Sequence, residues 1–417
     1  MGLSLRLLCS LWFKLNWRTS MIAIRLVTTG IVASAACSAI AGELSFKKHV
    51  LSTEFYSEGC AAGDFNKDGR IDVVAGPFWY QAPEGNDIWR PHEIRTPGKF
   101  VYNKGYSKSF VNAVVDVNKD GWDDVIIVGF PGESTHWYEN PQGKEGHWPE
   151  HVIFDNTCNE SPQVADVNQD GLIDLVFGSE KEKRMLWFSL PADGGAEAKW
   201  TRSDLVQKDS AGTCRFCHGL GVGDVNNDGR NDVLIRQGWW EAPSDPKSTD
   251  WTYHEAPLGE DCADMHVYDF DDDGDMDVIS SSAHRHGLWW HEQITDGGTS
   301  SWKTHTIYDK VSQMHALVLT DMNADGLPDL VTGKRFYAHN GHDPGGKDPA
   351  VLMWFEFSRK DGKPTWTPHE IDDDSGIGTQ FVVTDINGDK RPDIVTSNKR
   401  GTFVFIQRGD AKTVSSR

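Results

Sequence analysis

The chain has 417 residues, which is enough for one large all-β domain or two ordinary domains. Its formal net charge is −21, and residues 1–41 hold four cations and no acidic residue, so the remainder carries −25. A chain this acidic argues against nucleic acid as a partner, because such binding depends on Lys and Arg that neutralise phosphates.

The N-terminal segment, residues 1–41, has the features of a targeting signal. Met21 is a second candidate start, and it is followed by Arg25, an apolar stretch and the small-x-small sequence AIA at 39–41. We expect cleavage after Ala41 and a secreted or periplasmic protein. The alternative is a membrane anchor, but the apolar run is short and rich in Ala, Ser and Thr, so we expect no integral span in the mature chain.

An Asp-rich motif repeats through the rest of the chain. The first copy, GDFNKDGRID at 63–72, has side-chain oxygens at positions 1, 3, 5 and 9 of the ladder and Gly at position 6. Copies recur at separations of 45 to 64 residues, which indicates a structural period rather than low complexity. The ladders begin at Asp64, Asp116, Asp166, Asp224, Asp269, Asp321 and Asp385.

Each motif lies among four short β-rich runs. In the second copy these are VNAVVDV (111–117), DVIIVG (124–129), HWYEN (136–140) and WPEHVI (148–153). Four strands with Gly, Asp and Pro turns at this period are typical of propeller blades. The two-sandwich alternative gives no reason for a displaced fourth strand.

Closure of the ring follows from a count of the fourth runs. Six follow a motif, whereas there are seven motifs, and FKKHVL at 46–51 matches the missing one. We therefore predict an all-β fold, a seven-bladed β-propeller of four-stranded blades over residues 43–410, with the last blade closed by the N-terminal strand. Residues 411–417 are predicted to be a disordered tail.

The Asp-rich motifs are candidate calcium sites. Hard oxygen donors at alternating positions around a tight turn suit the coordination shell of Ca²⁺. We expect up to seven structural Ca²⁺ ions, with weak or no binding in the seventh motif, where Lys390 replaces Gly. The predicted ligands are Asp64, Asn66, Asp68, Asp72, Asp116, Asn118, Asp120, Asp124, Asp166, Asn168, Asp170, Asp174, Asp224, Asn226, Asp228, Asp232, Asp269, Asp271, Asp273, Asp277, Asp321, Asn323, Asp325, Asp329, Asp385, Asn387, Asp389 and Asp393.

These repeats resemble the FG-GAP, or VCBS, repeats of integrin α-subunit propellers and of many secreted bacterial proteins. The resemblance implies a calcium-stabilised propeller and says little about function. The stretch SQMHALVLTDMNADGLPDLVTGKRFYAHNGHDPG (312–345) is also similar to bacterial propellers of sugar chemistry. A weaker resemblance to the propeller domain of aldos-2-ulose dehydratase, without its cupin-like segments, points the same way.

The sequence CRFCH at 214–218 has the pattern that attaches haem c. No helical segment is predicted around it, and His218 lies six residues before an Asp-rich ladder. We therefore do not expect haem; the alternatives for Cys214 and Cys217 are a disulfide-like pair, free thiols or a soft-metal site. The same lead-in position in other copies holds Glu58, Glu160 and His315.

The sixteen histidines divide by their place in the repeat. Six belong to the fourth-strand pattern and are predicted to be structural: His49, His92, His151, His254, His305 and His369. His147 and His291 flank strands. Eight map to the face opposite the calcium turns, where loops on a rigid scaffold usually carry function.

That opposite face supplies the candidate functional residues. Imidazoles with a carboxylate can hold a transition metal such as Zn²⁺ or Mn²⁺. Alternatively, a neutral His abstracts a proton next to a carbonyl while Lys or Arg stabilises the enolate. The candidate catalytic residues are His218, His266, His315, His284, His286, Lys334, Arg335, Tyr337 and His339. The candidate substrate-binding residues are Glu58, Asp264, His136 and His342.

Two functions fit this sequence. The first is a secreted sugar lyase or dehydratase that works by β-elimination. The alternative is a non-catalytic carbohydrate-binding or adhesion propeller, whose partner is a glycan or a protein.

Overall fold

The computed structural model describes residues 44–191, 199–207, 209–262 and 264–409. The predicted targeting segment and the predicted tail lie outside these residues. Within the described residues, no helix is both long and apolar enough to pass through a bilayer.

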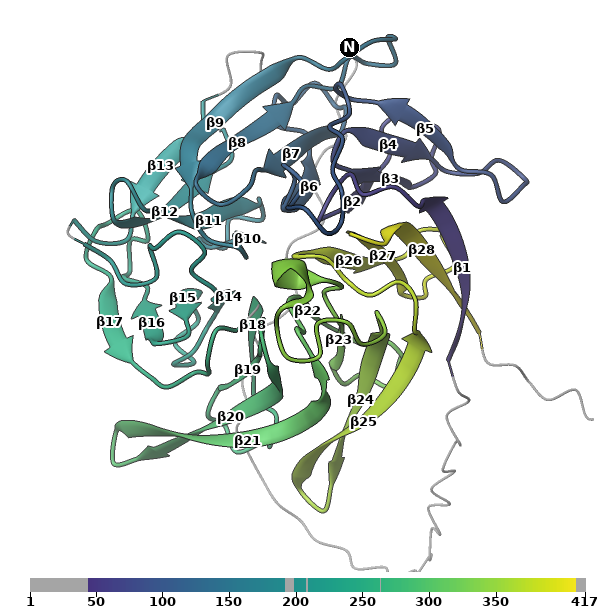
Figure 1. Cartoon of the computed structure of the whole chain (residues 1–417). Coiled ribbons are helices and arrows are strands. Elements are labelled where there is room, and N and C mark those ends of the chain that lie inside the picture. Colours follow the sequence, from purple (N-terminus) through teal and green to yellow (C-terminus); the bar gives the residue numbers. More distant parts are fainter. Residues whose placement is uncertain (1–43, 192–198, 208, 263, 410–417) are drawn as a thin grey trace, which may run out of the picture. The chain divides into compact units, whose positions relative to one another are not determined.

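The described residues form five four-stranded sheets and one eight-stranded sheet, arranged around a common centre (Figure 1). The first three sheets contain β2 (Ala61–Gly63), β3 (Asp72–Ala75), β4 (Phe78–Gln81) and β5 (Arg90–Glu93); β6 (Val111–Val115), β7 (Asp124–Val128), β8 (Glu133–Tyr138) and β9 (Glu150–Thr157); and β10 (Gln163–Ala165), β11 (Asp174–Ser179), β12 (Arg184–Ser189) and β13 (Thr201–Asp204).

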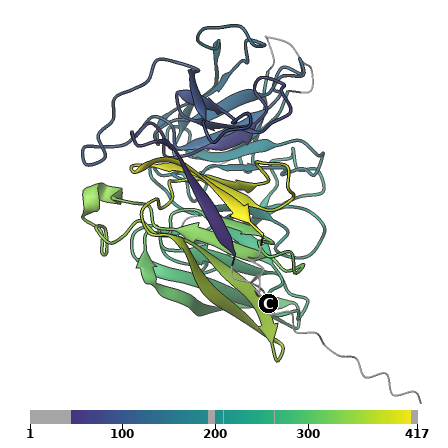
Figure 2. The same cartoon turned by 90° about the vertical axis from the view of Figure 1, so that its right-hand side faces the viewer.

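The other three sheets complete the described fold. The eight-stranded sheet contains β14 (Leu220–Gly223), β15 (Asp232–Ile235), β16 (Gly238–Glu241), β17 (Thr252–Glu255), β18 (Asp264–Tyr268), β19 (Asp277–Ser281), β20 (His286–Asp296) and β21 (Thr299–Ser312). The last two contain β22 (Leu317–Thr320), β23 (Asp329–Gly333), β24 (Leu352–Lys360) and β25 (Lys363–Asp372); and β26 (Phe381–Thr384), β27 (Asp393–Asn398), β28 (Gly401–Arg408) and β1 (Ser45–Ser52). The short 3₁₀ helix η1 (Ala338–Gly341) projects from one face (Figure 2).

The predicted four-stranded antiparallel unit and the propeller fold are confirmed, but seven separate blades are not what the structure has. Two units are joined because β14 and β18 pair in parallel, with Leu220 opposite Asp264 and Gly221 opposite Met265. The absence of a side chain at Gly221 permits this approach, since a Cβ there would lie 2.6 Å from the Met265 carbonyl oxygen. The glycine-rich sequence of β14 therefore fuses two neighbouring units into one sheet.

The N-terminal strand closes the last sheet, as the displaced fourth run predicts. Strand β1 pairs antiparallel with β28, from Ser45 opposite Arg408 to Ser52 opposite Thr402. The outer edge of the sheet β26–β27–β28 is thus covered by the beginning of the described chain, which removes an unpaired edge at the junction.

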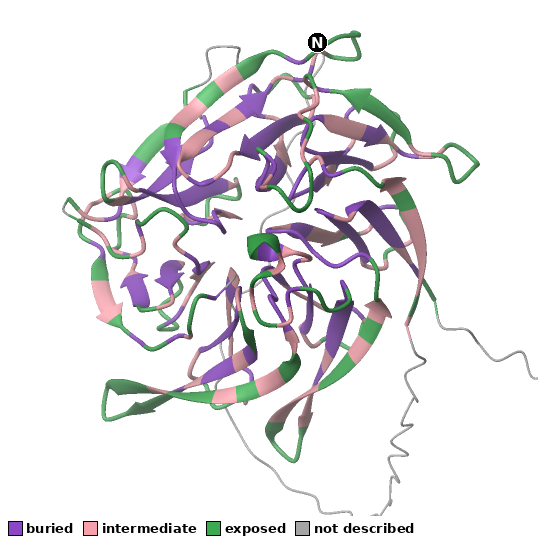
Figure 3. Ribbon diagram, viewed as in Figure 1, coloured by how far each residue is buried: buried purple, intermediate pink, exposed green. Residues whose placement is uncertain are grey.

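The core lies between neighbouring sheets. Second strands such as β3 and β7 are buried throughout, whereas the outer strand β5 is exposed throughout (Figure 3). Val176 and Trp187 of one sheet pack in one cluster with Val233 and Trp240 of the next. Because burial of an aliphatic side chain contributes about 1.5–3 kcal/mol, this packing between sheets is a main source of stability.

Five of the six fourth-strand histidines have the structural role predicted for them. Each stacks on the Trp of the third strand, with ring centroids 4.2–4.4 Å apart. Four of them also contact a Glu on that strand or directly after it, as His254 Nε2 does at 2.8 Å from Glu241. The sixth, His49 on β1, lies opposite Val404. The stacked pairs are Trp79–His92, Trp137–His151, Trp239–His254, Trp290–His305 and Trp354–His369.

Candidate functional site

The Asp-rich turns join the first and second strands of each unit. In the turn between β2 and β3, the Asp64 carboxylate accepts the N–H groups of Asp68 and Gly69 at 3.1 and 2.9 Å. In the fifth turn, Asp269, Asp271 and Asp273 each offer an oxygen, and these atoms lie within 4.8 Å of one another. A set of hard oxygens converging on one point fits Ca²⁺, so the fifth turn has donors suited to this ion. Calcium binding in the turns stays a prediction.

The carboxylate at position 9 of each turn has a backbone role that the sequence did not reveal. Asp72 is buried and accepts the N–H of Phe65 at 3.2 Å and that of Ala82, just after the third strand, at 2.7 Å. Burial raises the pKa of Asp72 to about 7. Six of the seven position-9 carboxylates tie the turn to the end of the third strand in this way, whereas Asp174 makes only the bond within its turn. The further role of these carboxylates as calcium ligands stays a prediction. The equivalent residues are Asp124, Asp174, Asp232, Asp277, Asp329 and Asp393.

The seventh turn keeps this backbone despite its substitution. Lys390 has φ 66°, the left-handed conformation in which the other turns use Gly, and its N–H donates to Asp385 at 2.7 Å. The Arg391 guanidinium forms an ion pair with Asp389. The first and fourth turns make the same pair through Arg70 and Arg230, so Lys390 is the cation that distinguishes the seventh turn. Weak calcium binding in this turn stays a prediction.

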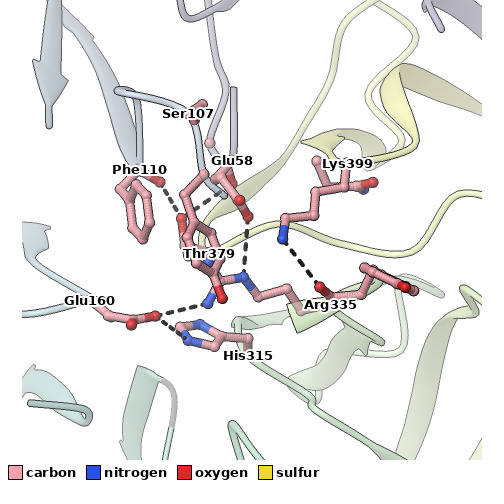
Figure 4. Close-up of polar contacts among 12 residues, drawn as sticks. Glu58, Ser107, Phe110, Glu160, His315, Arg335, Thr379 and Lys399 are labelled. Atoms are coloured by element: carbon pink, nitrogen blue, oxygen red, sulfur yellow. Dashed lines mark hydrogen bonds and ion pairs between the residues drawn. The ribbon is translucent and has the colours of Figure 1, made fainter. Parts of the chain in front are cut away.

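On the opposite face, lead-in residues from four units meet Arg335, which follows β23, in a buried cluster called the hub here: Glu58, Glu160, His218, His315 and Arg335. Figure 4 shows Glu58, Glu160, His315 and Arg335 of this cluster. The Arg335 guanidinium donates through Nε to Glu58 at 3.1 Å and through Nη1 to Glu160 at 2.8 Å. His315 Nε2 donates to the same Glu160 oxygen at 3.0 Å. The hub therefore bridges segments that lie far apart in the sequence.

Burial and charge set the protonation of the hub. All five side chains are at most 7% exposed. Burial alone would raise the pKa of Glu160, but the charges of His218 and Arg335 hold it well below its ordinary value. Burial, aided by the Arg335 charge, lowers the pKa of His315 to about 3, so this imidazole is neutral at pH 7.

Not every polar atom of the hub is satisfied by the described residues. Glu58 Oε1, His218 Nε2, His315 Nδ1 and Arg335 Nη2 are buried and have no hydrogen-bond partner there. An unpaired buried polar atom costs about 1–3 kcal/mol, and native structures keep few of them. Four in one cluster indicate a site that is built to receive another group.

An aromatic and cationic cover lies over the hub. The Arg335 guanidinium lies 5.2 Å from the Tyr106 ring centroid and 5.5 Å from that of Phe110. Lys399 Nζ lies 4.1 Å from the Tyr106 ring and donates to the Tyr337 carbonyl at 3.1 Å. Burial lowers the pKa of Lys399 to about 8. The cover thus brings Lys399, a second cation beside Arg335, close to the two carboxylates of the hub.

A row of four imidazoles, called the imidazole row here, leads from the hub to the surface: His315, His218, His284 and His339. Successive ring centroids are 5.2, 4.5 and 4.5 Å apart. Asp343 contacts Nδ1 of His284 at 3.4 Å and Nδ1 of His339 at 3.0 Å. A carboxylate on Nδ1 fixes the tautomer that leaves Nε2 with its lone pair, which is the arrangement a general base needs.

A cavity of about 330 Å³ reaches His284 from the outside. Two ion pairs border it, Arg236 with Asp261 at 3.3 Å and Arg285 with Glu260 at 3.9 Å. Its lining of arginines and carboxylates is polar, so it suits a hydroxylated and anionic ligand better than an apolar one.

The CRFCH sequence positions His218. Cys214 and Cys217 form a disulfide, which was one of the alternatives for this pair. The Cys217 carbonyl accepts the N–H of Glu160 at 3.1 Å, and the Phe216 N–H donates to the Cys158 carbonyl at 2.9 Å. The short disulfide loop thus connects two hub residues, His218 and Glu160, through its own backbone. Among the described residues, Cys60, Cys158 and Cys262 are buried free thiols.

His266 does not join the hub, contrary to the predicted grouping. It lies on β18 and lines a cavity of about 450 Å³ among the innermost strands, together with Asp264. His266 Nε2 donates to the Leu317 carbonyl at 3.0 Å, and Asp264 accepts the Leu317 N–H at 3.2 Å. His266 differs from the hub residues because it lies within strand β18, where alternate side chains face the cavity among the innermost strands, called the channel here. The hub residues instead precede or follow their strands.

The other predicted site residues are dispersed. His136 on β8 contacts Glu150 through Nδ1 at 2.9 Å and lines a different cavity. His286 and His342 are exposed. The Lys334 ammonium is bound to Ser312, Gln313 and the Gly345 carbonyl, so it fastens the loop that carries η1.

Several functional candidates were missed as site residues. Glu160 shares the lead-in position of Glu58, His218 and His315, and that spacing was the available signal. Asp343, Lys399 and Arg236 carry no such signal, because each reaches the site only through the folding of a loop.

Comparison with known proteins agrees with this fold. Residues 116–177, 166–235 and 269–332 match the FG-GAP-like repeat. Linkin from Caenorhabditis elegans is 26% identical over 212 residues, which cover 46% of this chain and 33% of linkin. The chain therefore spans about a third of the length of this relative.

The similarity to solved structures is more distant. YCF48 from Cyanidioschyzon merolae is 12% identical with a TM-score of 0.47, over 87% of this chain and 98% of YCF48. The rhamnogalacturonan lyase YesW is 11% identical with a TM-score of 0.43, over 86% of this chain and 75% of that one. By its sheet topology and its repeat matches, the chain is a β-propeller that carries FG-GAP-like repeats. The likeness to aldos-2-ulose dehydratase stays a prediction.

Proposed function

We propose that this chain is a secreted, calcium-stabilised propeller that acts on carbohydrate as a carbon–oxygen lyase. The observation that carries the proposal is the imidazole row, in which His284 faces a polar cavity and is oriented by Asp343. Calcium in the Asp-rich turns holds the scaffold on the other face. In this proposal the eight-stranded sheet counts as two blades, so that the ring has seven.

The proposed reaction is a β-elimination from a uronic acid or ketosugar. Arg236 and Arg285 bind the acidic or carbonyl group at the cavity. His284 Nε2 takes the proton from the carbon next to that group, the released electron pair forms the C=C bond, and the neighbouring C–O bond breaks. The proton passes through His339 to the leaving oxygen, so protons and electrons balance.

The pH dependence follows from the state of His284. Burial, with the charges of His218 and His339, lowers the pKa of His284 from its ordinary value of 6.5. The imidazole is therefore neutral at pH 7 and stays a base below pH 6.5. Activity is expected to be present at neutral pH and to be lost only as the pH falls through this lowered pKa.

Replacing His284 by Ala is expected to lower kcat by about 10²- to 10⁴-fold, the usual contribution of a general base. The assay follows the ultraviolet absorbance of unsaturated product from acidic polysaccharides and ketosugars. The matched control is His254→Ala, because His254 stacks on Trp239 at the rim, away from the cavity. Equal activity in the two variants would remove His284 from the mechanism.

A non-catalytic glycan-binding propeller is the second candidate. It is favoured by the two buried ion pairs through which Arg335 joins Glu58 and Glu160, because such a bridge between units can serve a purely structural role. Retention on acidic glycans without any unsaturated product, unchanged by His284→Ala, would support this function instead.

A further inference from the structure

Three hub atoms converge at the inner end of the imidazole row. Glu160 Oε2 lies 3.0 Å from His315 Nε2 and 3.6 Å from His218 Nε2. All three ligand atoms lie within 4.8 Å of one another, and all three residues are buried. Each residue comes from a different unit of the ring, so the fold itself creates this meeting point.

The spacing suits a metal ion. Nitrogen and oxygen donors at about 2.0–2.2 Å from a transition metal lie roughly 3–3.5 Å apart at tetrahedral or octahedral angles. His218 Nε2 is buried and has no hydrogen-bond partner among the described residues, so an ion would satisfy an otherwise costly atom.

The charge of the hub also suits a cation. Glu58 and Glu160 are two carboxylates, and Arg335 supplies one fixed positive charge between them. The imidazoles are neutral ligands when they bind a metal, and Lys399 is a further cation over the hub, with Nζ 4.1 Å from the Tyr106 ring. The two carboxylates offset part of the charge that a divalent ion brings, so the site depends mainly on the three converging donors and on the unpaired His218 Nε2.

We propose that Glu160, His218 and His315 bind one divalent transition metal ion of the class represented by Zn²⁺. Two imidazoles and one carboxylate are borderline ligands that Zn²⁺ favours over Ca²⁺, and they leave coordination positions for water or a substrate oxygen. This site is separate from the Asp-rich turns, whose all-oxygen ligands select Ca²⁺. It stands whether or not the chain is a lyase.

The test is metal loading of the purified full chain. The protein is stripped with a chelator, returned to excess Ca²⁺, loaded with Co²⁺ or Zn²⁺, and freed of unbound metal. Elemental analysis is expected to find one transition metal ion per chain, and Co²⁺ is expected to give the visible absorption of a low-symmetry site. His218→Ala and His315→Ala are expected to lose that ion, whereas His266→Ala keeps it, because His266 lies in the channel.

Two results would overturn the proposal: a wild-type chain that retains no Co²⁺ or Zn²⁺, or folded His218→Ala and His315→Ala variants that each still hold one ion. Should either variant fail to fold, the electron paramagnetic resonance spectrum of the wild type loaded with Cu²⁺ tests the site instead. Two coordinated imidazoles give nitrogen coupling in this spectrum, whereas a surface carboxylate site gives none. A chain that binds the ion but forms no unsaturated product retains this inference and refutes the proposed lyase.

Discussion

Chelating calcium from the purified protein is expected to lower its melting temperature by on the order of 10–20 °C. The turns place carboxylates together, as with Asp269, Asp271 and Asp273, whose oxygens lie within 4.8 Å of one another. Without a cation these charges repel. An ion held at a hundred times its Kd stabilises the folded state by about 2.7 kcal/mol per site, and several sites act together.

Differential scanning calorimetry with and without a calcium-selective chelator measures this effect. Readdition of Ca²⁺ should restore the melting temperature, whereas the same ionic strength of NaCl should not. Asp269→Asn is expected to remove more of the calcium effect than Asp385→Asn, since Lys390 and Arg391 already bring positive charge to the seventh turn. An unchanged melting temperature after complete calcium removal would exclude a structural role for the turns.

Replacing Arg335 by Met is expected to lower the free energy of unfolding by about 3–5 kcal/mol. Arg335 is 2% exposed and is the fixed cation bonded to both Glu58 and Glu160. Its removal leaves two buried carboxylates facing each other. Chemical denaturation of the variant and the wild type measures the difference.

The control for this prediction is Arg285→Met, because the Arg285–Glu260 pair is exposed and such pairs contribute about 0–1 kcal/mol. The pH dependence gives a second check. Burial raises the pKa of Glu160 while the charges of His218 and Arg335 lower it, so removing Arg335 is expected to bring that folded-state pKa closer to the unfolded value. The stability lost by Arg335→Met should therefore be largest at neutral pH and shrink as the pH falls through the titration of Glu160. Glu58→Gln in the Arg335→Met background should recover part of the loss. A variant as stable as Arg285→Met at all pH values would show that the hub charges are not coupled.

Local patterns predicted the strands and the turns, because the Asp-rich motif and the alternating runs determine backbone conformation through contacts between residues that are close in the sequence. Displacement of the run at 46–51 predicted the closing strand, since only pairing of β1 with β28 completes the last sheet. Fusion of two units by β14 and β18 was not predicted, because it depends on how closely Gly221 lets Met265 approach.

The candidate site was predictable only where the repeat itself carries it. The shared lead-in position pointed to Glu58, His218 and His315, and these residues do meet. His266 has the same chemistry but lies within a strand, so its side chain faces the channel. Asp343 and Lys399 lie in loops whose paths are set by long-range contacts, and no spacing in the sequence reports those contacts.

Anomalous X-ray diffraction from crystals loaded with Ca²⁺ and Zn²⁺ tests most directly whether the ring assembles two kinds of cation site on its two faces. The expected map has a zinc-edge peak within bonding distance of Glu160, His218 and His315, and calcium-type peaks in the Asp-rich turns such as Asp269–Asp273. A map with zinc only at exposed histidines such as His286 or His342, and with empty turns, would contradict both assignments.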